Sequence, residues 1–374
     1  MKQNICKRCV MDLSVADIVF HGEKGCNYCL KLSSDIERSG INNIQFQKEK
    51  LEQLIKDIKR KGRGKKFDCI VGVSGGVDSS WVLIKAIESG LRPLAVHMDN
   101  GWNSELAQNN IANLVNNLGV ELYTHVIDWA EYKGLMQAFF DADVLDVELL
   151  YDNAMLAVNY FEARKHGIKY ILSGDNTATE GMKMPQGWNW FKFDKKNIIS
   201  IGKNNKISLE TFPAIGTLGY FYYEFIRRIN WVHFLDLFNF NKSNSLDILE
   251  KDYGYKRYPY KHYESIFTRF YQGYILPQKF GVDKRKMHLS NLIVSGQMTR
   301  EEALNQINQI PYPSHEDLEN DIKYFLKKMD WSEDDLKSYI KRKPIPHDFY
   351  KSEKKLWEFA KKMHSVIIGQ KING

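Results

Sequence analysis

The sequence has few cysteines and no long apolar run. Only five of its 374 residues are cysteine, which is too few for the disulfide framework of a small secreted domain. No apolar run reaches the roughly 18 residues of a transmembrane helix, and the first residues do not form a secretory signal. Internal repeats and low-complexity tracts are missing as well, so a repeat architecture is not expected. We therefore expect a soluble, cytoplasmic protein.

The composition is that of a globular chain with a mild positive charge. Hydrophobic residues make up 43% of the sequence, and the formal net charge is +7. The length suggests about two domains. Basic chains often bind polyanions, namely nucleic acids, anionic membranes or phosphorylated substrates. A net charge of +7 does not indicate which of these three kinds of polyanion the chain binds.

Short apolar segments alternate with helical segments from residue 67 to residue 173. The pattern predicts strands over 67–73, 93–98, 121–127 and 169–173, and helices over 46–61, 78–89, 104–118, 130–141 and 148–166. Such alternation predicts a doubly wound parallel α/β sheet, which binds ligands beyond the carboxyl ends of its strands. Later segments are less regular: 186–206 is predicted to be a long loop, and helices are predicted over 220–240, 299–308, 314–341 and 350–367.

A glycine-rich turn follows the first predicted strand, with the sequence Val73-Ser74-Gly75-Gly76-Val77-Asp78-Ser79-Ser80. Paired glycines let backbone amides approach a ligand, and the start of a helix adds free N–H groups and a partial positive charge. The turn is therefore a candidate anion cradle. It contains neither the mononucleotide motif G-x-x-x-x-G-K-[ST] nor the dinucleotide motif G-x-G-x-x-G. The alternative is a glycine-rich turn without function.

The S-G-G-x-D-S run resembles the pyrophosphate loop (PP-loop) of the N-type ATP pyrophosphatases, which include asparagine, GMP and NAD synthetases and tRNA thiolases. The resemblance implies that this loop binds ATP and that Mg²⁺ is required. The implied nucleotide-binding residues are Val73, Ser74, Gly75, Gly76, Asp78, Ser79, His97, Asp99, Gly174 and Asn176. Asp78 and Asp175 are the candidate Mg²⁺ ligands and catalytic carboxylates, since Mg²⁺ prefers one or two carboxylates together with phosphate oxygens. The alternative role of Asp175 is a helix cap.

Four of the five cysteines form two closely spaced pairs. Cys6-x₂-Cys9 and Cys26-x₂-Cys29 have the spacing of a structural zinc site with four thiolate ligands. Such a site has no open position for catalysis and stabilises a module too small to fold alone. A redox pair is the alternative. Cys69 lies within a predicted strand and is expected in the core.

Three stretches resemble the N-acetyl sugar amidotransferases of bacterial surface-polysaccharide biosynthesis, the WbpG-like family. They are 6–12, 74–80 and 261–304. The resemblance implies a nucleotide-linked diacetamido sugar as substrate and conversion of one acetamido group to an acetamidino group through an O-adenylyl imidate, releasing AMP and pyrophosphate. This would serve lipopolysaccharide O-antigen synthesis. It also implies partners that supply ammonia, similar to the glutaminase and cyclase subunits of histidine biosynthesis.

The same resemblance suggests residues for the substrate side of the reaction. Lys279 and Arg285 are candidate catalytic cations, and the candidate substrate-binding residues are Lys261, His262, Arg269 and His288. A dense run of lysine and arginine is otherwise a solvated helix face, and a single histidine is otherwise structural. No glutaminase is encoded, because residue 2 is lysine rather than cysteine and no cysteine is left for a nucleophile elbow.

We therefore expect three parts: a four-cysteine zinc module over 1–45, a PP-loop domain over 46–235, and a mostly helical substrate region over 236–374. A tRNA-modifying thiolase or ligase is the alternative enzyme, and a zinc-ribbon binding protein with a degenerate nucleotide fold is the alternative without catalysis. Sulfur relay would need cysteines near the site, and this chain has none to spare. We expect no membrane partner and no nucleic-acid partner.

Overall fold

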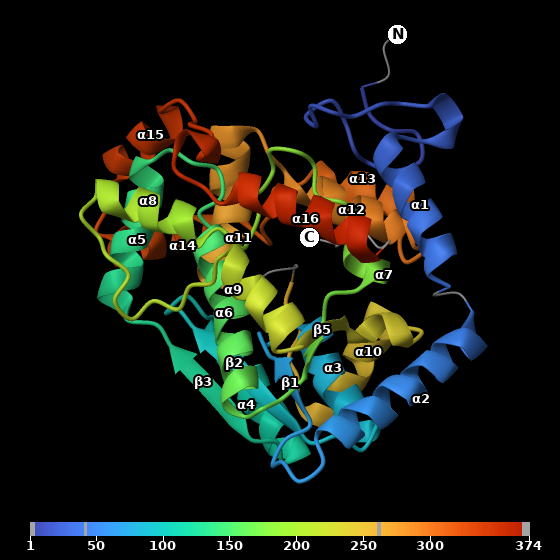
Figure 1. The fold of residues 1–374 in the computed structure, drawn as a ribbon. Helices are drawn as coiled ribbons and strands as arrows, with labels where there is room; N and C mark the ends of the chain where they lie inside the picture. Colours follow the sequence, from blue (N-terminus) through green and yellow to red (C-terminus); the bar gives the residue numbers. More distant parts are fainter. Residues whose placement is uncertain (1–3, 41–42, 260–262, 369–374) are drawn as a thin grey trace.

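Five parallel strands form one sheet at the centre of the computed structural model, which describes residues 4–40, 43–259 and 263–368 (Figure 1). The strand order is β3-β2-β1-β4-β5. The strands are β1 (Cys69–Gly72), β2 (Pro93–Asp99), β3 (Leu122–Val126), β4 (Tyr170–Ser173) and β5 (Asn230–His233). In β1, Ile70 lies opposite Leu94 of β2 and Ile171 of β4. The expected doubly wound α/β sheet is confirmed.

Helices bury both faces of the sheet, because successive side chains of a strand point to opposite sides. Cys69 and Val71 pack into one core, whereas Ile70 between them packs into the other. The first core is covered by α2 (Ile44–Lys61), α3 (Val77–Glu88), α4 (Glu105–Leu118) and α10 (Lys242–Tyr253). The second is covered by α5 (Trp129–Asp141) and α6 (Leu149–Lys165).

The C-terminal helices lie together on one side of the sheet, in orange and red in Figure 1, next to the N-terminal module. They are α11 (Ile266–Phe270), the π-helical segment η4 (Tyr271–Phe280), α12 (Lys284–Val294), α13 (Arg300–Ile307), α14 (His315–Met329), α15 (Glu333–Lys341) and α16 (Lys354–Ile368). The N-terminal module contains η1 (Gly22–Lys24) and α1 (Asn27–Ser39). Among the described residues, no helix has the length and apolar character needed to cross a membrane.

Short elements complete the chain between the sheet and its C-terminal cover. They are α7 (Thr177–Glu180), α8 (Lys195–Asn204), α9 (Thr217–Phe221), the π-helical turn η2 (Tyr222–Ile226), η3 (Phe234–Leu237) and η5 (His347–Phe349). Two predictions for this part were wrong. The loop predicted over 186–206 contains α8, whose first turn is capped by the side chain of Asp194. The helix predicted over 220–240 is interrupted by β5, which pairs with β4 at the edge of the sheet. Pairing outweighs the local preference of this aromatic segment.

Two helix boundaries follow directly from local chemistry. Thr299 and Glu302 form the capping box expected from the sequence, so α13 starts at Arg300. The helical stretch 314–341 divides at Asp330, whose φ is 56°, and Ser332 caps the next helix with Asp335. A left-handed residue of this kind ends a helix because it turns the chain away from the helix axis.

Candidate active site and cysteine cluster

The glycine-rich turn of residues 73–80, called the PP-loop below for its resemblance to that motif, lies at the point where the strand order changes direction. β1 is followed by α3, with residues 73–76 as the turn, and its neighbour β4 lies on the side opposite β2. In doubly wound sheets this switch point opens a crevice for ligands. Gly75 has a φ of 84°, and a Cβ there would be 2.8 Å from the carbonyl oxygen of Ala107 in α4. The turn therefore requires glycine at Gly75.

Two serines hold the turn in shape. The backbone N–H of Ser74 donates to Oγ of Ser79 (3.2 Å), and the N–H of Gly76 donates to Oγ of Ser74 (3.3 Å). Gly76, which precedes α3, offers no capping side chain. The first N–H groups of α3 are therefore not capped by the residue before the helix, as expected for a helix start that receives an anion.

Asp78 forms an ion pair within this turn region. Its Oδ2 lies 3.2 Å from Nζ of Lys242, the first residue of α10. Its other oxygen, Oδ1, is buried and has no hydrogen-bond partner. A buried carboxylate oxygen without a partner is costly, and a divalent cation would satisfy it. The carboxylate of Asp78 thus fits a Mg²⁺ ligand.

His97 and Asp99, at the end of β2, connect this strand to the PP-loop. Nδ1 of His97 donates to the carbonyl oxygen of Val73 (2.8 Å), and Nε2 accepts from the side-chain amide of Asn103 (3.0 Å). Burial lowers the pKa of His97, so the ring is neutral at neutral pH. The same amide of Asn103 donates to Asp99 (3.1 Å). His97 therefore supports the backbone of the loop, and its nucleotide contact stays a prediction.

The segment after β4 touches the loop from the other side of the switch point. A Cβ at Gly174 would lie 3.0 Å from the backbone nitrogen of Ser79. Asp175 is exposed, and its Oδ2 accepts from Oγ of Ser173 (2.6 Å). The two candidate Mg²⁺ carboxylates, Asp78 and Asp175, thus come from adjacent segments. Asn176 is buried, and its side chain caps α7 by accepting from the N–H of Thr179, so its nucleotide contact stays a prediction.

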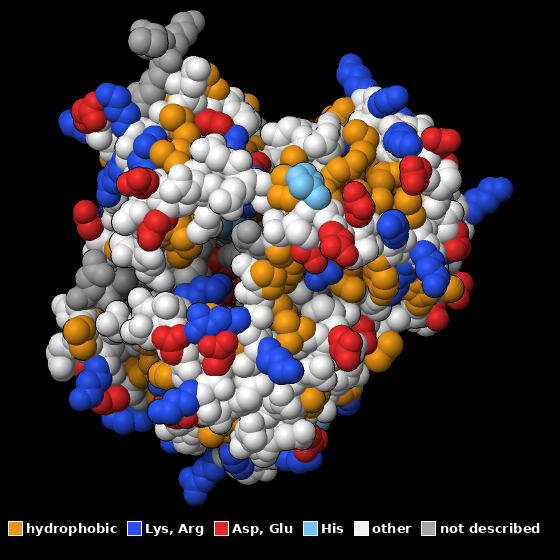
Figure 2. Space-filling view, turned by 180° about the vertical axis from the view of Figure 1, so that it is seen from behind, with side chains coloured by type: hydrophobic (Ala, Val, Ile, Leu, Met, Phe, Trp, Pro, Cys, Tyr) orange, Lys and Arg blue, Asp and Glu red, His pale blue; other side chains and the backbone are white. Residues whose placement is uncertain are grey.

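A cavity of about 350 Å³ lies between the start of α3 and the C-terminal helices. Figure 2 shows a hollow near the middle of one face, with charged side chains in and around it. The lining includes Lys242 and the predicted residues Arg269, Arg285 and His288. Lys284 lines it too, and its ammonium pairs with Glu148 (2.7 Å). The cavity is rich in cations, which favours an anionic ligand.

Both predicted arginines of this cavity already have carboxylate partners. Arg269 makes a two-pronged contact with Asp321, with both N···O distances at 2.6 Å. Arg285 pairs with Asp283 and also donates to carbonyl oxygens of 306–309, at the end of α13. Most N–H groups of Arg285 are therefore used to join α12 to α13. Its predicted role on the α-phosphate does not fit this arrangement.

Lys279 is not brought to the cavity. Its side chain is fully buried, its ammonium lies 2.9 Å from Asp143, and it donates to the carbonyl oxygens of Tyr339 and Arg342. These contacts join η4 to α15. The catalytic role predicted for Lys279 does not fit this position, because its ammonium is held by Asp143 and by two backbone carbonyl oxygens and does not line the cavity. Two further predicted residues, Lys261 and His262, lie outside the described residues.

Two residues at the loop were missed by the sequence analysis. Lys242 contacts Asp78, and the hydroxyl of Tyr258 donates to the carbonyl oxygen of Gly75 (3.0 Å). Both come from the region beyond the sheet and reach the loop only through the fold. No motif surrounds either residue, so nothing in the linear sequence singled them out.

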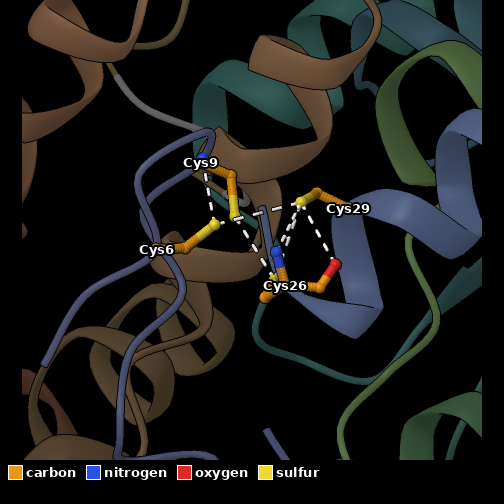
Figure 3. Close-up of side chains that lie close together, drawn as sticks. All are labelled: Cys6, Cys9, Cys26 and Cys29. Atoms are coloured by element: carbon orange, nitrogen blue, oxygen red, sulfur yellow. Dashed lines mark hydrogen bonds between the residues drawn. The ribbon is translucent and has the colours of Figure 1, made fainter. Parts of the chain in front are cut away.

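The four N-terminal cysteines form a compact sulfur cluster, with their side chains pointing toward one another (Figure 3). All four are fully buried. The Sγ atoms of Cys6 and Cys29 are 3.9 Å apart, and those of Cys9 and Cys26 are 3.8 Å apart. A tetrahedral zinc ion with Zn–S bonds of about 2.3 Å implies S···S separations of about 3.8 Å. The cluster therefore has the size and the donors of a four-thiolate zinc site.

The cysteine cluster rests on helices that line the cavity. The guanidinium of Arg300, at the start of α13, donates to the carbonyl oxygens of Cys6 (2.9 Å) and Cys9 (3.1 Å). The N–H of Val10 donates to Oγ of Ser290 in α12 (3.1 Å). The cysteine module thus contacts α12 and α13, which also line the cavity.

Comparison with known proteins gives a family match for the C-terminal part of the chain. No curated protein matches the chain. Two solved structures resemble part of it: an NMN synthetase from Francisella tularensis (17% identity, TM-score 0.30, 57% of this chain and 88% of that chain) and an NH3-dependent NAD synthetase from Campylobacter jejuni (14% identity, TM-score 0.28, 43% and 74%). Residues 264–364 match the C-terminal domain of WbpG-like LPS biosynthesis proteins, and they include Arg269, Lys284 and His288 of the cavity. The C-terminal part of the chain is therefore similar to the C-terminal domain of WbpG-like LPS biosynthesis proteins.

Proposed function

We propose that the chain is the synthetase subunit of an ATP-dependent amidotransferase that releases AMP and pyrophosphate. The observation that carries the proposal is the PP-loop at the switch point, where the buried, unpartnered Oδ1 of Asp78 lies at the start of a helix that has no side-chain cap. This arrangement suits a triphosphate with its Mg²⁺ ion. Mg²⁺, held by Asp78 and Asp175, would neutralise phosphate charge and polarise the reacting phosphorus.

We further propose that the second substrate is a nucleotide-linked N-acetylated sugar that binds in the cation-rich cavity. An amide oxygen is a poor leaving group, and its transfer onto AMP turns it into a good one. The amide oxygen attacks the α-phosphorus, the bond to the β-phosphate oxygen breaks, and pyrophosphate leaves with the electron pair. Ammonia then adds to the amide carbon, AMP departs with the former amide oxygen, and loss of protons gives the amidine. His288 and Arg269 line the cavity where the sugar nucleotide would lie.

Ammonia is proposed to come from a separate glutaminase. All five cysteines are buried, and burial raises the pKa of the Cys69 thiol. A glutaminase needs an exposed thiolate beside a base, so this chain offers no suitable nucleophile. For the cysteine cluster we propose zinc with a structural role, since four thiolates leave no open coordination position.

The test is an assay of the purified chain with a nucleotide-linked diacetamido sugar, Mg²⁺-ATP and ammonium. We expect stoichiometric AMP and amidino product, identified by the mass change from O to NH. Asp78→Asn should reduce pyrophosphate release at least about tenfold, the lower end of the loss of a charge-stabilising contact. Glu88→Gln, at the exposed end of the same helix, is the matched control. Unchanged turnover in a folded Asp78→Asn protein would reject the proposal.

A further inference from the structure

Lys242 lies where two helix starts meet. It is the first residue of α10, and its ammonium contacts Asp78 in the first turn of α3. A cation at a helix N-terminus is disfavoured by the positive end of the helix dipole. An anion beside Asp78 is favoured, because it would lie at the start of α3, which has no side-chain cap. The location therefore suits a phosphate group and makes a lysine there costly unless it has a strong anionic partner.

Lys242 differs from the other cations of the cavity in its ion-pair partner. Arg269, Lys284 and Arg285 pair with Asp321, Glu148 and Asp283, none of which belongs to the PP-loop. Within the described part of the cavity lining, Lys242 is the cation that pairs with a PP-loop carboxylate. That carboxylate is the one the proposed function assigns to Mg²⁺. Binding of the metal would therefore break the ion pair.

The side chain of Lys242 is only partly accessible, with 30% of its surface exposed. A partly buried ammonium that loses its carboxylate is stabilised by another anion, because an unpaired charge away from water is destabilising. The phosphates of ATP would be the nearest anions in a loaded PP-loop.

On the basis of the proposed function, we propose that Lys242 is a catalytic lysine that exchanges partners. It pairs with Asp78 when no nucleotide is bound, and it binds a phosphate oxygen of ATP once Mg²⁺ has taken Asp78. When the bond between the α-phosphorus and the bridging oxygen breaks, the electron pair goes to pyrophosphate, and the ammonium of Lys242 stabilises that charge. The lysine gains and loses no proton in this step.

The exchange predicts opposite effects of one substitution on two ligands. In Lys242→Met, Mg²⁺-ATP and Mg²⁺-pyrophosphate should bind at least about tenfold more weakly, whereas AMP should change less than about twofold. Mn²⁺ alone should bind more tightly than in the parent chain, because no ammonium competes for Asp78. Lys242→Arg should retain most of the affinity for ATP. Lys251→Met, exposed on the same helix, is the control for α10.

Calorimetric titration of the full chain with ATP, AMP, pyrophosphate and Mn²⁺ measures these affinities, and thermal melting checks the fold of each variant. Lys242→Gln provides the same comparison if the methionine variant is unstable. A folded neutral variant with parental affinity for ATP would overturn the role of Lys242 and leave the proposed function intact. Failure of the parent chain to bind Mg²⁺-ATP would instead overturn the proposed function. Weaker binding of both Mn²⁺ and ATP would also contradict the exchange, because it indicates general damage to the loop.

Discussion

Gly174, at the end of β4, lies directly against the backbone of Ser79 at the start of α3. A Cβ at Gly174 would be 3.0 Å from the nitrogen of Ser79 and 3.1 Å from the carbonyl carbon of Asp78. Both neighbours are backbone atoms, so neither can rotate away. Because Gly174 has no side chain, the segment that carries Asp175 can lie this close to the PP-loop.

Gly174→Ala should therefore weaken binding of Mg²⁺-ATP by about tenfold, because the displaced segments no longer hold Asp78 and Asp175 at one metal. Titration of the folded variant with ATP measures the effect. Gly219→Ala in α9 is the control, since the nearest atom to its Cβ would be a movable side-chain atom of Ile215. Parental affinity in Gly174→Ala would show that the close approach is not needed for the nucleotide.

Loss of one cysteine ligand should affect the cavity as well as the metal. We expect Cys26→Ser to lose its bound zinc, measured by metal analysis, and to melt at a lower temperature, because the remaining three thiolates bind zinc less tightly. Hydrogen exchange should increase in α12 and α13, which contact the cluster through Ser290 and Arg300. Cys69→Ala, in a strand far from the cluster in sequence, should retain zinc. Iron in the native protein, or full zinc retention in Cys26→Ser, would reject the assignment.

The purified chain should use ammonium but not glutamine. With ATP and the sugar substrate, activity with ammonium should rise with pH toward the pKa of ammonium, because free ammonia is the nucleophile. Adding the glutaminase partner should restore the use of glutamine and flatten this pH dependence. Product mass spectrometry measures both. Equal use of glutamine and ammonium by the chain alone would show that one of its buried cysteines becomes accessible.

Acid should destabilise the protein through His347. Its Nε2 accepts from the N–H of Asp146 (3.0 Å) and its Nδ1 donates to Asn197 (2.8 Å), and burial lowers the pKa of His347 to about 4. The unfolded chain binds a proton near pH 6.5, whereas the folded chain does not until about pH 4. The stability contribution is therefore complete above about pH 6.5 and is lost as the pH falls toward 4, by about 3 kcal/mol at most.

Denaturant unfolding of the parent chain and of His347→Gln between pH 7 and pH 4 tests this expectation. The variant should be less stable at pH 7, because glutamine cannot reproduce both hydrogen bonds, and its stability should depend less on pH. Parallel acid curves for the two proteins would assign the loss to other groups.

The sheet and the PP-loop could be predicted because their determinants are contiguous. Each strand is a short apolar run, and the turn from Ser74 to Ser79 carries its glycines, hydroxyls and carboxylate within six positions. The cysteine pairs could be recognised for the same reason, because the two residues of each pair are close together in the sequence. β5 was missed because its aromatic residues suit a helix or a strand, and only pairing with β4 decides between them.

The substrate side could not be predicted, since its contacts join distant parts of the chain. Lys242 lies 164 positions from Asp78, and Tyr258 lies 183 positions from Gly75. For Lys279 and Arg285 the sequence shows a cluster of cations but not their partners. The ammonium of Lys279 pairs with Asp143 in the interior. The guanidinium of Arg285 donates to a carbonyl oxygen at the end of α13. Charge alone does not show which cation will face a ligand.

The contact between Arg300 and the cysteine module has a consequence for how the chain is made. Synthesis produces Cys6 well before Arg300, which follows 294 positions later. The four thiols are therefore exposed to the cell while the sheet is still being translated, and α12 and α13, which contact the cysteine module, follow the sheet. Such long-range closure slows folding and makes the two ends of the chain depend on each other. A nascent chain that stops before α13 should consequently lack a stable metal site, even though every cysteine of that site has already been made.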